Sequence, residues 1–118
     1  VYKTLVALSD VPHSKPLLVM IAADRRLNLK KLARAIGEKK LRMAHHAEAE
    51  RLTGLQVGGI SALALLDKNF VKFLDQQAIL LDDIVVSAGK RGLNLRLGVD
   101  DLLRVTGATL VDVTDELD

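Results

Sequence analysis

The first 22 residues show the pattern of two β-strands joined by a turn. Residues 1–9, VYKTLVALS, alternate apolar and polar positions and are rich in β-branched side chains. Residues 16–22, PLLVMIA, form a continuous apolar run, which is typical of a buried strand. Because the segment DVPHSKP between the two runs is rich in turn-forming residues, the pattern predicts a β-hairpin.

Three later segments place apolar residues at helical spacing, and each is followed by a glycine, a common residue at the end of a helix. The predicted helices span residues 29–36, 46–53 and 99–106, and the glycines are Gly37, Gly54 and Gly107. Asn28 stands directly before the first helix, where its side chain is suited to an N-cap. The ends of these helices are therefore predicted from local sequence signals.

The remaining strand candidates are interspersed among the helices without regular spacing. They lie at residues 41–44, 71–74, 83–88, 93–97 and 108–114. A fold built from βαβ units would alternate strands and helices regularly. We therefore predict an α+β fold with a mixed sheet, formed as a single domain over residues 1–118.

Composition narrows the class of protein further. The chain has 118 residues, of which 49% are apolar, and this suits one domain with one core. It contains no apolar run near the roughly 20 residues that a membrane helix needs, and no cysteine that could form a disulfide or act as a nucleophile. We expect a cytoplasmic protein with no membrane contact.

The three histidines are not arranged as metal ligands. His45 and His46 are adjacent, so they cannot share one helix face, and His13 lies in a predicted turn. The chain contains no HxxxH pattern. We expect no metal site, and we expect these histidines to be solvated or to cap a helix.

Positive charge is concentrated in one part of the chain. Eight of the 17 basic residues lie between Arg25 and Arg42, and the predicted helix in this region points Lys30, Lys31 and Arg34 outward. Such a surface can attract a phosphate backbone, although it can also be an ordinary solvated helix face. With one tyrosine and two phenylalanines, the chain has little aromatic surface on which bases could stack.

The usual enzyme signatures are absent, since the sequence contains no GxSxG, GxxxxGK[ST] or GxGxxG motif. What remains is a pair of glycine loops, GLQVGGIS and SAGKRG, and a lone lysine, Lys3, in the first strand. Lys3 could face solvent, and the glycines could form ordinary tight turns. Together, however, backbone N–H groups at Gly58 and Gly59 and the Lys3 ammonium could stabilise a developing oxyanion, which would allow ester cleavage without a protein nucleophile.

Four blocks of the sequence resemble the YbaK-type aminoacyl-tRNA deacylases, which are related to the editing domain of bacterial prolyl-tRNA synthetases. The blocks are VYKTLVAL, LNLKKLARAIGEKKLRMA, LTG followed by GGIS, and VSAGKRGLNLRL, and they cover nearly the whole chain in order. The resemblance implies a compact editing domain with a partly barrel-like mixed sheet and about three flanking helices. It also leaves open that family residues upstream of Val1 are missing.

The resemblance implies trans-editing, the hydrolysis of a mischarged tRNA such as Cys-tRNA(Pro) or a similar small amino acid on tRNA(Pro), without a cofactor. In this family the thiol of the cysteine substrate attacks its own ester carbonyl. Lys3, which would orient the aminoacylated end, and Gly58 and Gly59, beside the ester carbonyl, are the implied catalytic residues. The expected substrate-binding residues are Thr4, Ile60, Ser61, Ser87, Gly89 and Asn94, and the expected tRNA-binding residues are Lys30, Lys31 and Arg34. The resemblance leaves open prolyl-tRNA synthetase as a second partner.

Several positions depart from the family pattern. Ala62 follows Ser61 where a proline is usual, and Asn94 stands where an acid is frequent. His45 and His46 replace the Asp-Pro that starts the second helix. A non-catalytic module that binds an aminoacyl-tRNA end or a small amino acid is therefore the alternative hypothesis.

Overall fold

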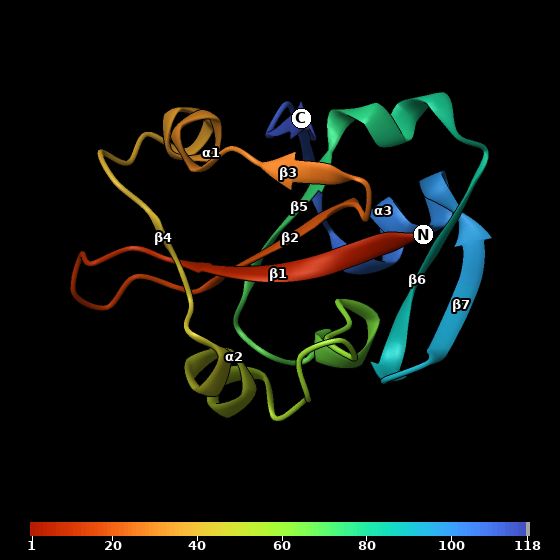
Figure 1. Cartoon of the computed structure of the whole chain (residues 1–118), viewed down its shortest axis with the longest axis horizontal. Helices are drawn as coiled ribbons and strands as arrows, with labels where there is room; N and C mark the ends of the chain where they lie inside the picture. The colour runs from red at the N-terminus through yellow and green to blue at the C-terminus, as the bar shows by residue number, and fades with distance from the viewer. Residues whose placement is uncertain (118) are drawn as a thin grey trace.

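The computed structural model describes residues 1–117, over which it has three helices and nine strands (Figure 1). The strands are β1 (Tyr2–Leu8), β2 (Leu17–Ala22), β3 (Arg25–Leu27), β4 (Arg42–Met43), β5 (Val71–Asp75), β6 (Asp83–Lys90), β7 (Leu93–Gly98), β8 (Thr109–Val111) and β9 (Thr114–Glu116). The helices are α1 (Leu29–Ile36), α2 (His46–Thr53) and α3 (Val99–Thr106), with 3₁₀ segments η1 (Leu63–Leu65) and η2 (Gln76–Leu80).

Five strands form the main sheet in the order β4-β1-β2-β5-β8. β1 pairs antiparallel with β2 and with β4, whereas β2–β5 and β5–β8 are parallel pairs. The predicted hairpin and the predicted mixed sheet are therefore confirmed. Because β4 and β8 are edge strands, the main sheet is open and does not close into a barrel.

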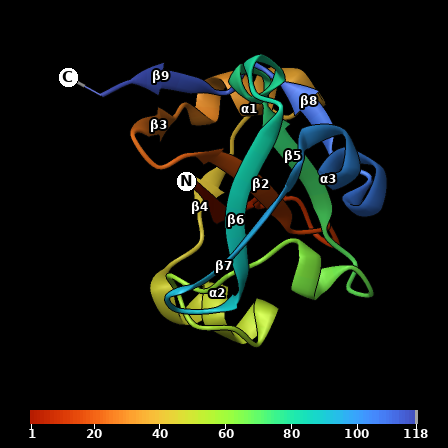
Figure 2. The ribbon, with the colours of Figure 1, turned by 90° about the vertical axis from the view of Figure 1, so that its right-hand side faces the viewer.

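Two smaller antiparallel pairs complete the strand structure. β3 pairs with β9, and β6 pairs with β7 to form a second hairpin. Figure 2 shows this β6–β7 hairpin crossing the main sheet, where β6 contacts β1. The hairpin thus brings the second half of the chain beside the first strand.

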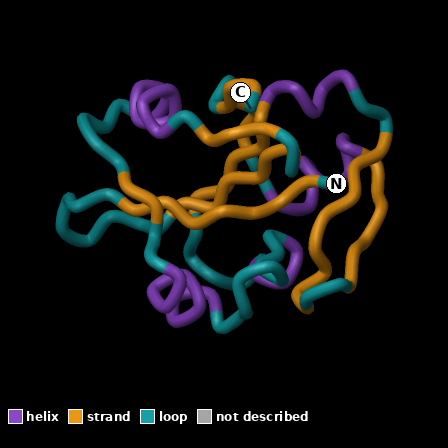
Figure 3. The backbone as a smooth tube through the Cα atoms, in the orientation of Figure 1, coloured by secondary structure: helices purple, strands orange, loops and turns teal. Residues whose placement is uncertain are grey.

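The three helices begin and end where the sequence predicts. The Asn28 side chain accepts a hydrogen bond from Lys31 N at 3.1 Å, and Gly37 ends α1 with a φ of 74°. Gly54 and Gly107 end α2 and α3 in the same left-handed conformation. Figure 3 shows α1 and α2 on opposite sides of the β1–β2 hairpin. None of the helices in the described part of the chain is long and apolar enough to cross a membrane.

The central strand β2 is buried on both faces of the sheet. Leu18 and Met20 belong to the core cluster that also contains residues of α2, α3 and β6, whereas Leu17, Val19 and Ile21 belong to the cluster beneath α1. This alternation explains why the strand is apolar at nearly every position.

The C-terminal region differs from the prediction. Residues 108–114 were expected to form one strand, but the chain leaves the main sheet after Val111 and starts the separate strand β9. The buried carboxylate of Asp75 accepts hydrogen bonds from Val113 N at 3.2 Å and from Thr114 Oγ1 at 2.8 Å, which holds the chain in this bend. The partner strand β3 was not predicted, because its three residues include two arginines and show no alternation.

Candidate active site

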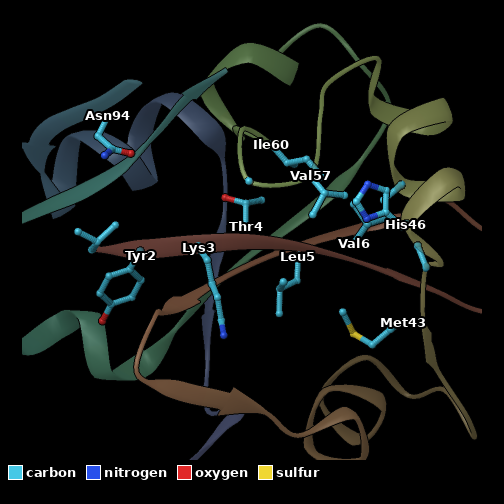
Figure 4. A pocket seen from close by; sticks show the side chains of 14 residues that line it. Tyr2, Lys3, Thr4, Leu5, Val6, Met43, His46, Val57, Ile60 and Asn94 are labelled. Carbon is cyan, nitrogen blue, oxygen red and sulfur yellow. The ribbon is translucent and has the colours of Figure 1, made fainter. Parts of the chain in front are cut away.

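A cavity of about 520 Å³ opens along the outer edge of β1 (Figure 4). Its walls come from β1 and the residue before it, from β4 and α2, from the loop that follows α2, and from β7. Besides the Tyr2 ring, the polar side chains in the wall are Lys3, Thr4, His46 and Asn94. A concave, mainly apolar space with a few polar groups is the usual form of a small-ligand site.

Beside the cavity, part of the backbone edge of β1 is unpaired. Val1 O accepts a hydrogen bond from Ala23 N at 2.9 Å, so the odd-numbered residues of β1 are the ones that bond to β2. The even-numbered residues direct their N–H and C=O groups away from β2, and there Val6 O accepts a bond from Ala44 N at 3.0 Å. Within residues 1–117 no strand pairs with Thr4 on this side and no hydrogen bond engages its main-chain groups there, so these groups are available to a ligand.

Thr4 also offers its hydroxyl group. The residue is 9% exposed, and no hydrogen bond within residues 1–117 engages its Oγ1. Every fully enclosed side-chain polar atom in the same residues has a partner, so this hydroxyl retains some access to the cavity. In Figure 4 Thr4 projects toward the side of β1 on which Val57 and Ile60 lie.

Lys3 projects from β1 on the side opposite to Thr4, as the alternation of a strand requires (Figure 4). Its side chain is exposed at the cavity rim and forms no ion pair in the part of the chain that the structure describes. A lone ammonium in this position can hold a phosphate or carbonyl oxygen. Lys3 thus faces solvent, which is one of the alternatives that the sequence left open, and it also contributes to the cavity wall.

The adjacent glycines Gly58 and Gly59 have different structural roles. Gly58 lines the cavity with a φ of 93°, and its N–H forms no hydrogen bond within the described residues. Gly59 does not line the cavity, and its N–H donates to Gln56 O at 2.8 Å. A Cβ on Gly59 would lie 2.8 Å from Arg91 N, so this glycine permits a close approach of two backbone segments. Of the two, Gly58 is the one with an N–H available to a ligand.

The second glycine loop packs against the first, and neither Ser87 nor Gly89 is among the residues that line the cavity. Gly89 has a φ of 106°, and a Cβ there would lie 3.4 Å from Ala64 Cβ. Arg91 Nε donates a 2.7 Å hydrogen bond to Val57 O. These contacts fix the relative positions of the two loops.

Ser61 and Ser87 each accept a local backbone hydrogen bond. Ser61 is 1% exposed, lies outside the cavity wall, and accepts from Ala64 N at 3.2 Å, whereas Ser87 accepts from Gly89 N at 3.3 Å. Ala62 is also buried, so the first loop is held by packing at the position where the family usually has proline. Neither serine is placed as a nucleophile in the cavity.

The other predicted site residues are divided between the cavity and α1. Ile60 lines the cavity near the middle of β1, and Asn94 lies toward the first residues of this strand (Figure 4). Lys30, Lys31 and Arg34 lie on α1, outside the cavity wall.

The three α1 cations differ in how far they are available to a partner. Lys30 and Arg34 are exposed, whereas Lys31 pairs with Asp115 at 3.1 Å and with Asp112 at 3.4 Å. The hydrogen bond to Asp115 raises the pKa of Lys31. Lys31 therefore links α1 to the C-terminal strand region through ion pairs. Lys30 and Arg34 are more accessible to a partner than Lys31.

His46 lines the cavity, although it is not among the site residues predicted from the sequence. It is the first residue of α2, and its Nε2 lies 3.3 Å from Glu50 Oε2. The same carboxylate oxygen accepts a 2.8 Å hydrogen bond from Val57 N in the loop. The i, i+4 spacing of His46 and Glu50 is visible in the sequence, but their common position at a cavity depends on the tertiary fold. Across residues 1–117, no three His, Asp or Glu side chains are grouped as metal ligands.

Comparisons with known proteins show the family to which the chain is related. The family profile described as "Aminoacyl-tRNA editing domain" matches residues 1–105. An Enterococcus faecalis protein that carries the provisional name Cys-tRNA(Pro)/Cys-tRNA(Cys) deacylase EbsC is 35% identical over 114 residues, which cover 97% of this chain and 68% of that protein. Proline-tRNA ligase 1 of Anaeromyxobacter dehalogenans is 34% identical over 114 residues, which cover 94% of this chain but 19% of the ligase.

Two solved structures share the fold. The hypothetical protein APE2540 superposes with a TM-score of 0.88 at 29% identity, covering 98% of this chain and 74% of the other. A protein assigned provisionally as a trans-editing enzyme for prolyl-tRNA synthetase superposes with a TM-score of 0.83 at 27% identity, covering 97% and 69%. The family profile and the EbsC similarity each span most of the chain, and the resemblance stated from the sequence is confirmed. This chain belongs to the aminoacyl-tRNA editing domain family.

Proposed function

We propose that this protein is a trans-editing aminoacyl-tRNA deacylase that hydrolyses the ester of a mischarged tRNA. Its substrate is Cys-tRNA(Pro) or a similar small amino acid on tRNA(Pro), and it acts in the cytoplasm. Membership of the editing family and the similarity to EbsC support this reaction class. The observation that carries the proposal is the cavity along β1, which offers hydrogen-bonding groups and a cation but no serine or cysteine nucleophile.

The described groups can perform this reaction by positioning the substrate. The Thr4 hydroxyl and the Gly58 N–H are free to hold the ester carbonyl, and Lys3 supplies positive charge for an oxygen of the aminoacyl or phosphate group. With a cysteine substrate, the thiol sulfur bonds to the carbonyl carbon, the bond to the tRNA oxygen breaks, and the thiol proton passes to that oxygen. The released product is the cyclic thiolactone of cysteine, and water opens this ring to give free cysteine, which completes the hydrolysis. Holding thiol and carbonyl together makes this attack effectively intramolecular.

The nucleic-acid partner in this proposal is the tRNA for proline. The exposed cations Lys30 and Arg34 on α1, together with Lys3 at the cavity, are the charges that we assign to its phosphates. Similarity to a segment of proline-tRNA ligases supports the choice of tRNA, and it also makes a complex with prolyl-tRNA synthetase a candidate arrangement.

Deacylation of Cys-tRNA(Pro), Ala-tRNA(Pro) and Pro-tRNA(Pro) by the purified protein tests this proposal. We expect release from at least one mischarged tRNA and none from Pro-tRNA(Pro). The variant Lys3→Ala should lose about 10²-fold in rate, a loss typical of an electrostatic contact to the reacting group. Lys72→Ala removes a cation of β5 outside the cavity and serves as the matched control. A folded protein that binds charged tRNA but releases nothing would instead favour a non-catalytic binding module.

A further inference from the structure

The polar group at one end of the cavity is an imidazole. Figure 4 shows His46 beside Val57 and on the Met43 side of the cavity, whereas Asn94 lies at the opposite end. Apart from His46, the wall here is apolar and is made by Met43, Ala49 and Val57. A small side chain entering this end would therefore meet alkyl groups and one imidazole.

Glu50 lies next to one of the two imidazole nitrogens. Its Oε2 lies 3.3 Å from His46 Nε2, so Nδ1 is the ring nitrogen that does not face this carboxylate. An imidazole that carries its single proton on Nε2 offers the lone pair of Nδ1 as a hydrogen-bond acceptor. Because Oε2 also accepts from Val57 N at 2.8 Å, the carboxylate is held between α2 and the loop.

We propose that His46 selects the amino acid in this cavity by accepting a hydrogen bond from the thiol or hydroxyl of a small polar side chain. Glu50 is the positioning residue in this proposal, because its carboxylate lies beside the ring and accepts a hydrogen bond from the loop. The ligand class is an aminoacyl group with an S–H or O–H donor on a short side chain, and alkyl side chains of equal size are disfavoured. This inference rests on the proposed deacylase function for the identity of the ligand.

Non-hydrolysable adenosine analogues that carry the amino acid through an amide bond test the assignment. The cysteinyl and α-aminobutyryl compounds are nearly equal in size and differ in the S–H donor. We expect the wild-type protein to bind the cysteinyl compound about tenfold more tightly, which corresponds to one hydrogen bond. His46→Ala should abolish this preference by weakening the cysteinyl compound alone. His45→Ala removes the adjacent imidazole, which does not line the cavity, and should leave the preference intact.

A preference that survives in His46→Ala, or an equal loss for both compounds, would overturn the role of His46. Hydrolysis of Cys-tRNA(Pro), measured with the same proteins, separates this result from the fate of the proposed function. If binding shows a preference that depends on His46 but no charged tRNA is hydrolysed, the role of His46 in specificity is supported and the deacylase function is refuted. If His46→Ala still hydrolyses Cys-tRNA(Pro) and keeps the preference for the cysteinyl compound, the deacylase function is supported and the role of His46 in specificity is refuted.

Discussion

Replacing Gly59 by alanine tests why the loop carries two adjacent glycines. The added Cβ would lie 2.8 Å from both Arg91 N and Lys90 C, whereas ordinary contacts begin at 3.4 Å. The loop and the β6–β7 turn must therefore separate by about 0.6 Å, the difference between these distances. Overpacking of this kind costs about 1–3 kcal/mol of unfolding free energy, and the displacement also moves Gly58 in the cavity wall. We expect Gly59→Ala to lower both stability and deacylation.

The measurements are urea denaturation followed by circular dichroism and deacylation of Cys-tRNA(Pro). Gly107→Ala is the matched control, because that glycine has a φ of 70° but no atom within 4 Å of its added Cβ. It should cost about 1 kcal/mol from backbone conformation alone and leave the reaction rate unchanged. If Gly59→Ala keeps wild-type stability but loses hydrolysis, the close backbone approach is not the reason for this glycine. The substrate would then be what requires it, as the sequence alone suggested.

Three further changes probe separate parts of the structure. Thr4→Val removes a hydroxyl that has no hydrogen-bond partner within residues 1–117, so deacylation should fall about tenfold with little change in stability. An unchanged rate would exclude the hydroxyl from substrate binding. The hydrogen bonds from Arg42 lower the pKa of Glu48 from its ordinary value of 4.5 to about 2. The pair therefore stabilises the fold at pH values above 4.5, and this stabilisation disappears as the pH falls from 4.5 toward 2. Glu48→Gln should flatten that part of a stability-against-pH curve, and an unaltered curve would contradict the role of the pair. Asp75→Ala leaves two buried donors unpaired, so the unfolding free energy measured by urea titration should fall by about 3 kcal/mol. If this free energy does not change beyond the measurement error, the bend after Val111 does not need the carboxylate.

The helix boundaries could be predicted because their signals are local. The Asn28 side chain bonds to a backbone N–H three residues away, and Gly37 ends the same helix with a left-handed φ of 74°. Both effects depend on a few neighbouring residues, which the sequence presents together. The strand β3 had no such signal, since pairing with β9, far along the chain, is what makes it a strand.

The candidate site was predictable in part, and the difference again depends on distance along the chain. Lys3, Thr4 and Gly58 were chosen from the sequence, and all three line the cavity. The direction in which Gly59 faces could not be deduced, because it depends on the approach of a turn more than thirty residues away. The same is true of His46, whose neighbours in the cavity come from separate elements.

The unpaired edge of β1 has a consequence for how copies of this protein behave in concentrated solution. An exposed strand edge normally offers a template on which another chain can add a strand, and it is a common starting point for aggregation. Here the free groups near Thr4 lie at a concave surface, bordered by α2, the loop around Gly58 and the β6–β7 hairpin. A small ligand can reach them, whereas a flat strand from another molecule meets these borders first. The walls that form the binding cavity therefore also protect this part of the β1 edge from pairing with another molecule.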